Sequence, residues 1–562
     1  MTDEMIDMSE DNSFDDTTGA ALVSAQDLHA WLQDGAELAL VDVSEAGQYG
    51  EGHLLLAANI PFSELEPQII QRVPRRSTRV VLVGAVAVVH RAAQRLRSLG
   101  YTHLHVLDGG LAAWAAAGYP VFKGIYVPSK AFAECVELTR HTPTLEPQAL
   151  QQLLQQGDDV VVLDSRTAKE YARFHVPGAI SCPGSELLYR LATLVPSRNT
   201  HVVISCAGRT RGIMGGQTLI DAQVPYRVSV LSGGTQGWKL AGFGVEQSAA
   251  EPLPQPEAVE AETALSRAQV LTQSLAIPVV GRHDLAQWQA DDHRTTFLVD
   301  VRDPQEAKAR PVPGAIAVAG VQLLQTTDTH VSVHGARIVL ADDQGVRAHT
   351  TAYWLHQQGW SVAVLAAGDT FVASPAPLAT DKDSVQAQRQ ALLRGTPVLT
   401  LEEVAQAIRA GAAVVSVQPS EVFVQGAVAG AVWSHRAAIA EGAVDAVEPK
   451  DNGVRLVIAS DAVVGALAAQ EWQARVASAQ PVAVGVLNLG DWETLAQWGL
   501  VVDPNAPTLQ PEQRVDFLYW LHDRHTGNAQ ASRQYLQWEA QLPAQIGHWP
   551  DAHFRIAQVQ GG

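Results

Sequence analysis

A cysteine followed by a short basic loop is the part of this sequence best suited to covalent chemistry. An apolar run leads to Cys206, the loop 207–211 follows with glycine, threonine and two arginines, and a helix pattern covers 212–221. At a helix N-terminus, free backbone N–H groups favour negative charge and lower the pKa of a thiol. The pattern therefore predicts a reactive thiolate at Cys206, with Arg209 and Arg211 as neighbouring positive charges.

The composition narrows the class of protein. With 562 residues, the chain is long enough for about four domains at roughly 150 residues each. A net charge of −20 argues against binding to nucleic acid or to an anionic membrane surface, and no apolar run approaches the roughly 20 residues of a membrane span. Three cysteines are too few for a disulfide framework, and the acidic N-terminus does not resemble a signal peptide. We therefore expect a cytoplasmic protein without membrane or nucleic-acid partners.

The same succession of strand, helix and glycine-rich turn recurs along the chain. Residues 107–110 and 231–234 each begin with leucine and end in Gly-Gly, and in both cases tryptophan follows four residues later and glycine four residues after that. Two matches in register indicate an internal repeat. A third repeat is visible from the strand pattern 297–302, and a weaker fourth contains the strand patterns 413–416 and 455–459.

Short β-branched strands alternating with helices predict an α/β fold, with parallel-rich sheets and helices on both faces. The predicted divisions are an acidic disordered tail (1–22), a first repeat without a nucleophile (23–125), a second repeat with Cys206 (126–246), a linker rich in Pro, Glu and Ala (247–268), a third repeat (269–378), a fourth repeat (379–505) and a C-terminal helical extension (506–562). The aromatic residues of this extension are expected to pack on the last repeat.

Three motifs of the second repeat together resemble those of the rhodanese sulfurtransferase family. The first motif consists of Asp164, Arg166, Glu170 and His175. It matches the family's first signature, although Phe174 stands where many members have glycine. Loop 206–211 resembles the six-residue active-site loop, and 231–238 resembles the closing signature. The resemblance extends over about 24–505, in a tandem four-domain form.

The resemblance implies a ping-pong sulfur transfer. Cys206 would be the nucleophile that takes a sulfane sulfur from thiosulfate or a similar donor and holds it as a persulfide. The acceptor would be cyanide, a thiol or a protein cysteine, no cofactor or metal would be needed, and the protein would act in sulfur metabolism. The persulfide would be cradled by Ala207, Gly208, Arg209, Thr210 and Arg211.

The first motif is expected to support the loop rather than to react. Asp300, Arg302 and Glu306 repeat its charged residues in a repeat that has no cysteine at the loop position, which favours an internal network of charges and hydrogen bonds. His175 is interpreted in the same way. Cys135 and Cys182 are expected to be structural, because free cysteines are often buried as small apolar residues.

The other three repeats have Gly84, Asp342 and Ser460 where the second has Cys206. We therefore predict one active repeat and three inactive ones. Two alternatives stay open: a scaffold or sulfur relay for a protein partner with little turnover, and a cysteine-dependent phosphatase. Phosphatases of similar fold need a loop one residue longer, whereas Arg211 is the sixth residue from Cys206, which favours sulfur.

Overall fold

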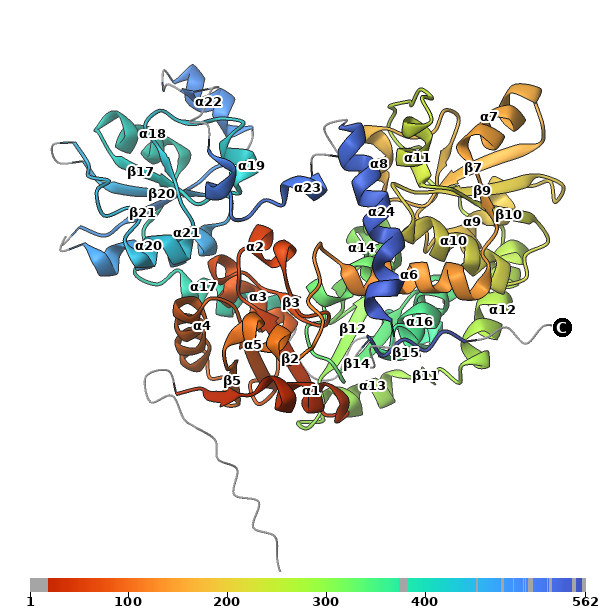
Figure 1. Ribbon diagram of the computed structural model, residues 1–562, viewed down its shortest axis with the longest axis horizontal. Coiled ribbons are helices and arrows are strands. Elements are labelled where there is room, and N and C mark those ends of the chain that lie inside the picture. The colour runs from red at the N-terminus through yellow and green to blue at the C-terminus, as the bar shows by residue number, and fades with distance from the viewer. Residues whose placement is uncertain are drawn as a thin grey trace, which may run out of the picture. The chain divides into compact units, whose positions relative to one another are not determined.

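The computed structural model describes residues 19–372, 382–450, 453–476, 480–488, 490–498, 500, 502–503, 509–522, 524, 528–547 and 552–557. The chain divides into two compact units (Figure 1). Unit 1 combines Met1–Val121 with Gln386–Phe517, and unit 2 combines Phe122–Val385 with Leu518–Gly562. Unit 1 therefore holds the first and fourth repeats, and unit 2 holds the second and third. Most of the predicted acidic tail, residues 1–18, lies outside the described residues.

Each repeat contains one five-stranded sheet, and all strand pairs within these sheets are parallel. In spatial order, the strands of the first repeat are β1 (Ala21–Val23), β5 (Leu104–Leu107), β4 (Arg79–Val83), β2 (Leu38–Asp42) and β3 (Ala58–Asn59), and those of the second are β6 (Thr144–Leu145), β10 (Arg227–Leu231), β9 (His201–Ser205), β7 (Val160–Asp164) and β8 (Ile180–Ser181). The strands of the third repeat are β11 (Val279–Val280), β15 (Ser361–Leu365), β14 (Arg337–Ala341), β12 (Thr296–Asp300) and β13 (Ile316–Ala317). Those of the fourth are β16 (Val398–Leu399), β21 (Ala483–Val486), β20 (Arg455–Ala459), β17 (Ala413–Ser416) and β19 (Val432–Trp433). A two-stranded antiparallel pair joins β18 (Ala427–Val428) to β22 (Val502–Asp503). The predicted fold class is confirmed, including four copies of one strand order.

Helices connect these strands. In the first and second repeats they are α1 (Ala25–Gln33), α2 (Ala46–Glu51), α3 (Leu65–Arg72), α4 (Val86–Ser98), α5 (Gly110–Ala116), α6 (Val127–Arg140), α7 (Pro147–Gln156), α8 (Ala168–Arg173), α9 (Leu187–Leu194), α10 (Thr210–Asp221) and α11 (Gly234–Leu240). Further along the chain they are α12 (Ala258–Ser274), α13 (Arg282–Gln289), α14 (Pro304–Ala309), α15 (Gly320–Gln325), α16 (Val346–Gln357), α17 (Lys382–Leu392), α18 (Leu401–Arg409), α19 (Ser420–Phe423), α20 (Arg436–Glu441), α21 (Ala462–Arg475), α22 (Asp491–Gln497), α23 (Tyr519–His522) and α24 (Ala529–Ile546). In the described chain no helix is both long and apolar enough to cross a bilayer.

The core of the second repeat explains the position of its loop. All five residues of β9 are buried, because helices cover both faces of a parallel sheet. Helix α10 packs closely on β9 and β10, since a β-carbon at Gly216 would lie only 2.5 Å from Val230 Cγ2. Glycine weakens a helix by about 1 kcal/mol, but here it allows the middle of α10 to pack closely against β10.

A buried arginine joins the two repeats within each unit. In unit 1, Arg436 of the fourth repeat donates to both carboxylate oxygens of Glu66 in the first repeat, at 2.5 and 2.8 Å, and to Glu471 at 3.1 Å. In unit 2, Arg347 of the third repeat donates to Glu186 of the second repeat at 3.1 Å. Such pairs are specific in geometry because the guanidinium group presents its donors in a rigid fork.

Two expectations about connecting segments are corrected. The predicted linker 247–268 includes the first part of α12, which packs on α9 and α16. The C-terminal extension does not pack on the last repeat as a whole. Arg514 and Asp516 do contact Ser420 there, but α24 belongs to unit 2 and packs across α6 of the second repeat (Figure 1).

Candidate active site

Cys206 lies at the carboxyl edge of the second sheet, between β9 and α10. The register pairs Asp164 at the end of β7 with Ser205 at the end of β9, so the first motif and the cysteine loop emerge side by side. Helix α10 begins at Thr210, and its first backbone N–H groups face the loop. The Cys206 side chain is buried, with 2% exposure.

The closing motif, residues 231–238, holds the cysteine loop through hydrogen bonds to two of the loop's backbone carbonyl groups. The carbonyl of Cys206 accepts from Thr235 N–H at 2.7 Å and from the Thr235 hydroxyl at 2.8 Å. The carbonyl of Ala207 accepts from Gln236 N–H at 3.0 Å. Gly234 has a φ of +56°, and a β-carbon there would lie 2.4 Å from the Cys206 carbonyl oxygen. The second glycine of the motif, Gly234, is therefore required by the close approach of α11 to the loop.

Gly234→Ala is expected to distort the loop and reduce the activity that depends on Cys206. Its matched control is Gly242→Ala, because Gly242 also has a positive φ, of +88°, but a β-carbon there would have nothing within 4 Å. Both variants should lose about 1–2 kcal/mol from the left-handed conformation, measured by chemical denaturation. Only Gly234→Ala should also slow alkylation and turnover at Cys206, and equal activity in both variants would contradict this account.

Gly212 leaves room for the sulfur atom, because a β-carbon there would lie 3.3 Å from Cys206 Sγ. Burial nevertheless raises the pKa of Cys206 to about 11, although the Arg211 charge and the Gly212 N–H oppose this rise. The expected lowering of the thiol pKa is therefore wrong for this state of the protein, because desolvation outweighs the helix terminus.

The charged residues of the first motif surround the loop arginine. Arg211 donates to both oxygens of Glu170, at 2.6 and 2.7 Å. Arg166 and Asp164 form a second bidentate pair, with contacts of 2.9 and 2.6 Å, and both are buried. The His175 ring stacks on the ring of Tyr171 in α8, with ring centroids 3.7 Å apart.

Glu170→Gln is expected to remove an acid-sensitive part of the stability. Although burial opposes it, the Arg211 guanidinium lowers the pKa of Glu170 from 4.5 to about 2. The ion pair therefore stabilises the fold fully above pH 4.5, and this contribution disappears as the pH falls toward 2. Denaturation of both proteins should give a larger difference in unfolding free energy at pH 7 than at pH 3, and a constant difference would contradict the assignment.

Arg209 points away from Arg211 and toward α6. It donates to Glu134 at 2.7 and 2.8 Å and also binds Glu137. Burial raises the pKa of Glu134 to about 7, although the charge of Arg209 opposes this rise. Beside Arg209 a cavity of about 380 Å³ opens to solvent, and it is also lined by Gly233 and by Leu536 of α24. Of the loop residues, Arg209 lines this cavity.

Helix α24 covers the loop, which the sequence motifs did not predict. Tyr535 Cε1, Leu536 Cδ2 and Glu539 Oε2 lie 3.3, 3.4 and 3.0 Å from a β-carbon built on Gly208. Lys130 of α6 donates to the Tyr535 hydroxyl at 2.5 Å, and that hydroxyl donates to Glu539 Oε1 at 2.5 Å. The only sequence signal was the helical spacing of these three residues of α24, which identifies one face but no partner.

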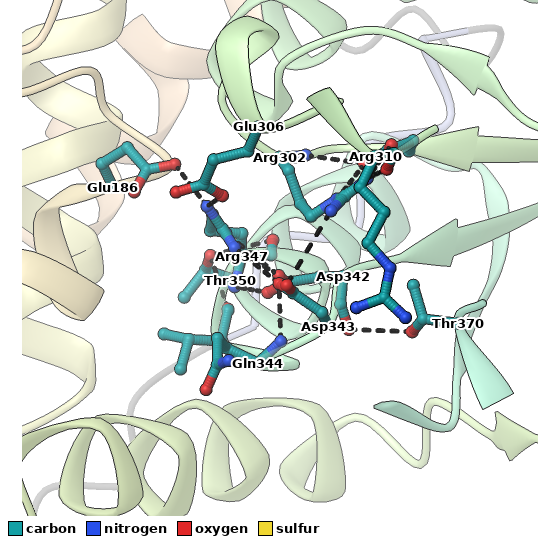
Figure 2. Close-up of polar contacts among 12 residues, drawn as sticks. Glu186, Arg302, Glu306, Arg310, Asp342, Asp343, Gln344, Arg347, Thr350 and Thr370 are labelled. Atoms are coloured by element: carbon teal, nitrogen blue, oxygen red, sulfur yellow. Dashed lines mark hydrogen bonds and ion pairs between the residues drawn. The ribbon is translucent and has the colours of Figure 1, made fainter. Parts of the chain in front are cut away.

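The third repeat has a loop of the same length, and it holds a carboxylate in place of the thiol (Figure 2). Asp342 occupies the cysteine position and accepts backbone N–H bonds from Gln344 at 3.2 Å and from Arg347 at 2.8 Å. Arg347 is the sixth residue of this loop, as Arg211 is of the other, and its side chain donates to Asp342 at 2.8 Å. The loop geometry of this protein can therefore hold a buried anion.

The loop positions of unit 1 carry no such group. Gly84 has a φ of +149°, and a β-carbon there would lie 3.1 Å from Val43. In the fourth repeat Ser460 is exposed, and the following Asp461 instead accepts from the first N–H groups of α21, at 2.9 and 3.1 Å. Neither loop contains a thiol, and neither has a basic side chain at its sixth position.

The remaining cysteines differ from Cys206 in their surroundings. Cys182 is fully buried at the end of β8, and burial raises the pKa of its thiol. Cys135 is half-buried on α6, and burial likewise raises the pKa of its thiol. Among the described residues, no group of three or more His, Cys, Asp or Glu side chains could hold a metal ion.

Comparisons with known proteins agree on one family. The family model of the rhodanese-like domain matches residues 24–117, 146–241 and 282–369. A solved structure of a thiosulfate sulfurtransferase from Pseudomonas aeruginosa superposes with a TM-score of 0.85 at 34% identity, covering 95% of this chain and 99% of that one.

Two curated proteins named thiosulfate sulfurtransferase match over shorter stretches. The one from Pseudomonas aeruginosa is 30% identical over 175 residues, which is 26% of this chain and 62% of its own length. The one from Azotobacter vinelandii is 28% identical over 218 residues, 34% of this chain and 76% of its own length. Taken with the shared strand order of the four sheets and the near-complete match to the solved structure, these similarities make the chain a member of the rhodanese-like family.

Proposed function

We propose that the protein is a sulfurtransferase that carries a sulfane sulfur on Cys206, with thiosulfate or a similar compound as donor and a thiol or cyanide as acceptor. The observation that carries this proposal is the six-residue loop from Cys206 to Arg211, in which the buried thiol lies at the start of α10 and Arg211 and the Gly212 N–H both favour its charged form. Named thiosulfate sulfurtransferases among the similar proteins support it.

The proposed reaction has two displacement steps. The Cys206 thiolate attacks the outer sulfur of thiosulfate, the S–S bond of the donor breaks, and its electron pair leaves with sulfite. The terminal sulfur of the Cys206 persulfide is then attacked by cyanide or a thiolate. The new S–S bond breaks, and its electron pair returns to the Cys206 thiolate. Backbone N–H groups and Arg211 stabilise the anion on the loop in both steps.

The third repeat supports this role for the loop. Its buried Asp342 carboxylate occupies the position that is equivalent to the proposed persulfide of the second repeat. Backbone N–H groups and the arginine at the sixth place of the loop donate to this carboxylate. A persulfide is also an anion of small size, so the same donors suit it. In the second repeat Arg211 is already neutralised by Glu170, which limits the charge that the loop offers to a dianionic donor.

The test is a persulfide trap on the wild-type protein. After incubation with thiosulfate, the protein should gain the mass of one sulfur atom, and peptide mapping should locate it on the peptide with Cys206 rather than on those with Cys135 or Cys182. Addition of cyanide should remove the mass and release thiocyanate. Release of phosphate from an aryl phosphate without a sulfur adduct would overturn the proposal in favour of the phosphatase alternative. Absence of both reactions would favour the scaffold alternative.

A further inference from the structure

Glu539 places an unpaired carboxylate oxygen next to the cysteine loop. The side chain is 1% exposed. Its Oε1 atom accepts from Tyr535 at 2.5 Å and from Thr210 at 3.4 Å, and Lys130 Nζ lies 3.5 Å away. Its Oε2 atom is buried and has no hydrogen-bond partner among the described residues. A buried carboxylate oxygen without a donor is costly, and this one faces the loop, 3.0 Å from a β-carbon built on Gly208.

Two neighbouring cations, Lys130 and Arg524, leave this oxygen without a hydrogen bond. The Arg524 guanidinium lies 3.5 Å from the centre of the Tyr535 ring. Lys130 donates to the Tyr535 hydroxyl and approaches only Oε1. Burial lowers the pKa of Lys130 to about 7, although Glu539 opposes this change. The two loop arginines are occupied elsewhere, Arg209 by Glu134 and Arg211 by Glu170. The loop therefore meets a negative charge on α24 that its own arginines do not neutralise.

The open cavity beside Arg209 borders the face of α24 that carries Glu539. Leu536 lines the open cavity beside Arg209, and its side chain also lies 3.4 Å from a β-carbon built on Gly208. Leu536 and Glu539 are three residues apart on the helix and share one face. Cys206 and Glu539 do not line this cavity, so an acceptor would have to displace the Leu536 side chain to come close to the Oε2 atom.

We propose that Glu539 selects the sulfur acceptor, favouring thiols with a protonated amine close to the sulfur and disfavouring anionic thiols. This inference rests on the proposed persulfide at Cys206. The ammonium group of such a thiol would donate to Glu539 Oε2 while its thiolate attacks the terminal sulfur of the persulfide. The S–S bond to Cys206 breaks, the electron pair stays on Cys206, and the acceptor leaves as its own persulfide.

The experiment uses the full-length protein, loaded with sulfur by thiosulfate and checked by mass. Single-turnover transfer is measured to cysteamine, 2-mercaptoethanol and 3-mercaptopropionate, which carry a positive, a neutral and a negative group. Glu539→Gln is expected to lower the ratio of the cysteamine rate to the 3-mercaptopropionate rate by about tenfold. The intrinsic reactivity of each thiol cancels when the two proteins are compared. The matched control is Glu262→Gln. This substitution makes the same charge change at an exposed position of α12.

The outcomes separate this inference from the proposed function. If Cys206 takes up sulfur but the ratio is the same in wild type and Glu539→Gln, the selection by Glu539 is wrong and the sulfurtransferase proposal stands. If the wild-type protein takes up no sulfur, both fall. Should Glu539→Gln fail to fold, the wild-type ratio is compared with that of a free alkyl persulfide. A wild-type ratio no higher than this reference overturns the inference, and a ratio about tenfold higher supports it.

Discussion

Cys206→Ala is expected to lower the rate of thiocyanate formation from thiosulfate and cyanide by on the order of 10⁴-fold or more, because removal of a covalent nucleophile leaves only binding and the anion-stabilising loop. The fold should change little. The thiol is small and buried, and the loop backbone is held by Thr235 and Gln236 rather than by the sulfur. Initial rates and the intact mass after incubation with thiosulfate are the measurements.

The matched controls are Cys182→Ala and Cys135→Ala. Cys182 is fully buried at the end of the neighbouring strand β8, and Cys135 lies on α6. Both variants should keep the wild-type rate and still take up one sulfur atom. Loss of sulfur uptake in Cys182→Ala with retention in Cys206→Ala would move the nucleophile to the other cysteine and refute the assignment of the loop.

The repeated fold and the position of the loop can be predicted from local patterns. Ser24 is a good residue to begin a helix, and its side chain does cap α1, accepting from Asp27 N–H at 3.1 Å. Apolar β-branched runs form the buried strands of each sheet, because such runs are compatible with a parallel sheet covered on both faces. The helix pattern after Cys206 starts two residues late, at Gly212, whereas α10 begins at Thr210.

The cover over the loop cannot be predicted in this way. Lys130 and Glu539 are 409 positions apart in the sequence and meet only because α24 returns to α6. No local pattern specifies such a contact, and an isolated Lys or Glu on a helix usually faces solvent. The error in the pKa of Cys206 has a related origin. Burial raises this pKa, and the charge of Glu539 on the distant helix α24 adds to the rise.

The repeats without a cysteine have a physical role that their sequences only partly indicate. In the third repeat the loop binds its own carboxylate, and the arginine of that loop continues across to Glu186 of the second repeat (Figure 2). The loop that carries a thiol in the second repeat corresponds, in the third repeat, to a loop that contacts the neighbouring repeat. In the third repeat the residue at the cysteine position is therefore part of this contact, because Asp342 pairs with the arginine that reaches Glu186.

Arg347→Ala is expected to destabilise unit 2 by about 3–5 kcal/mol, the usual cost of removing one partner from a buried ion pair. Arg347 is 1% exposed and donates to Asp342, Asp343, Glu186 and Glu306. Its loss leaves the buried Asp342 carboxylate without a guanidinium partner, whereas Glu186 and Glu306 keep Arg190, at 3.0 and 2.9 Å. Chemical denaturation monitored by tryptophan fluorescence should show the loss.

Two further variants serve as controls for Arg347→Ala. The first replaces a surface arginine, and the second tests whether the charge or the volume of the Arg347 side chain matters. Arg198→Ala removes an exposed arginine of the same unit and should change the unfolding free energy by no more than about 0.5 kcal/mol. Adding Asp342→Asn to Arg347→Ala removes the stranded charge, so the double variant should be more stable than Arg347→Ala alone. If Asp342→Asn instead makes Arg347→Ala less stable, the two residues act independently, and the packing of the long side chain rather than its charge holds the repeats together.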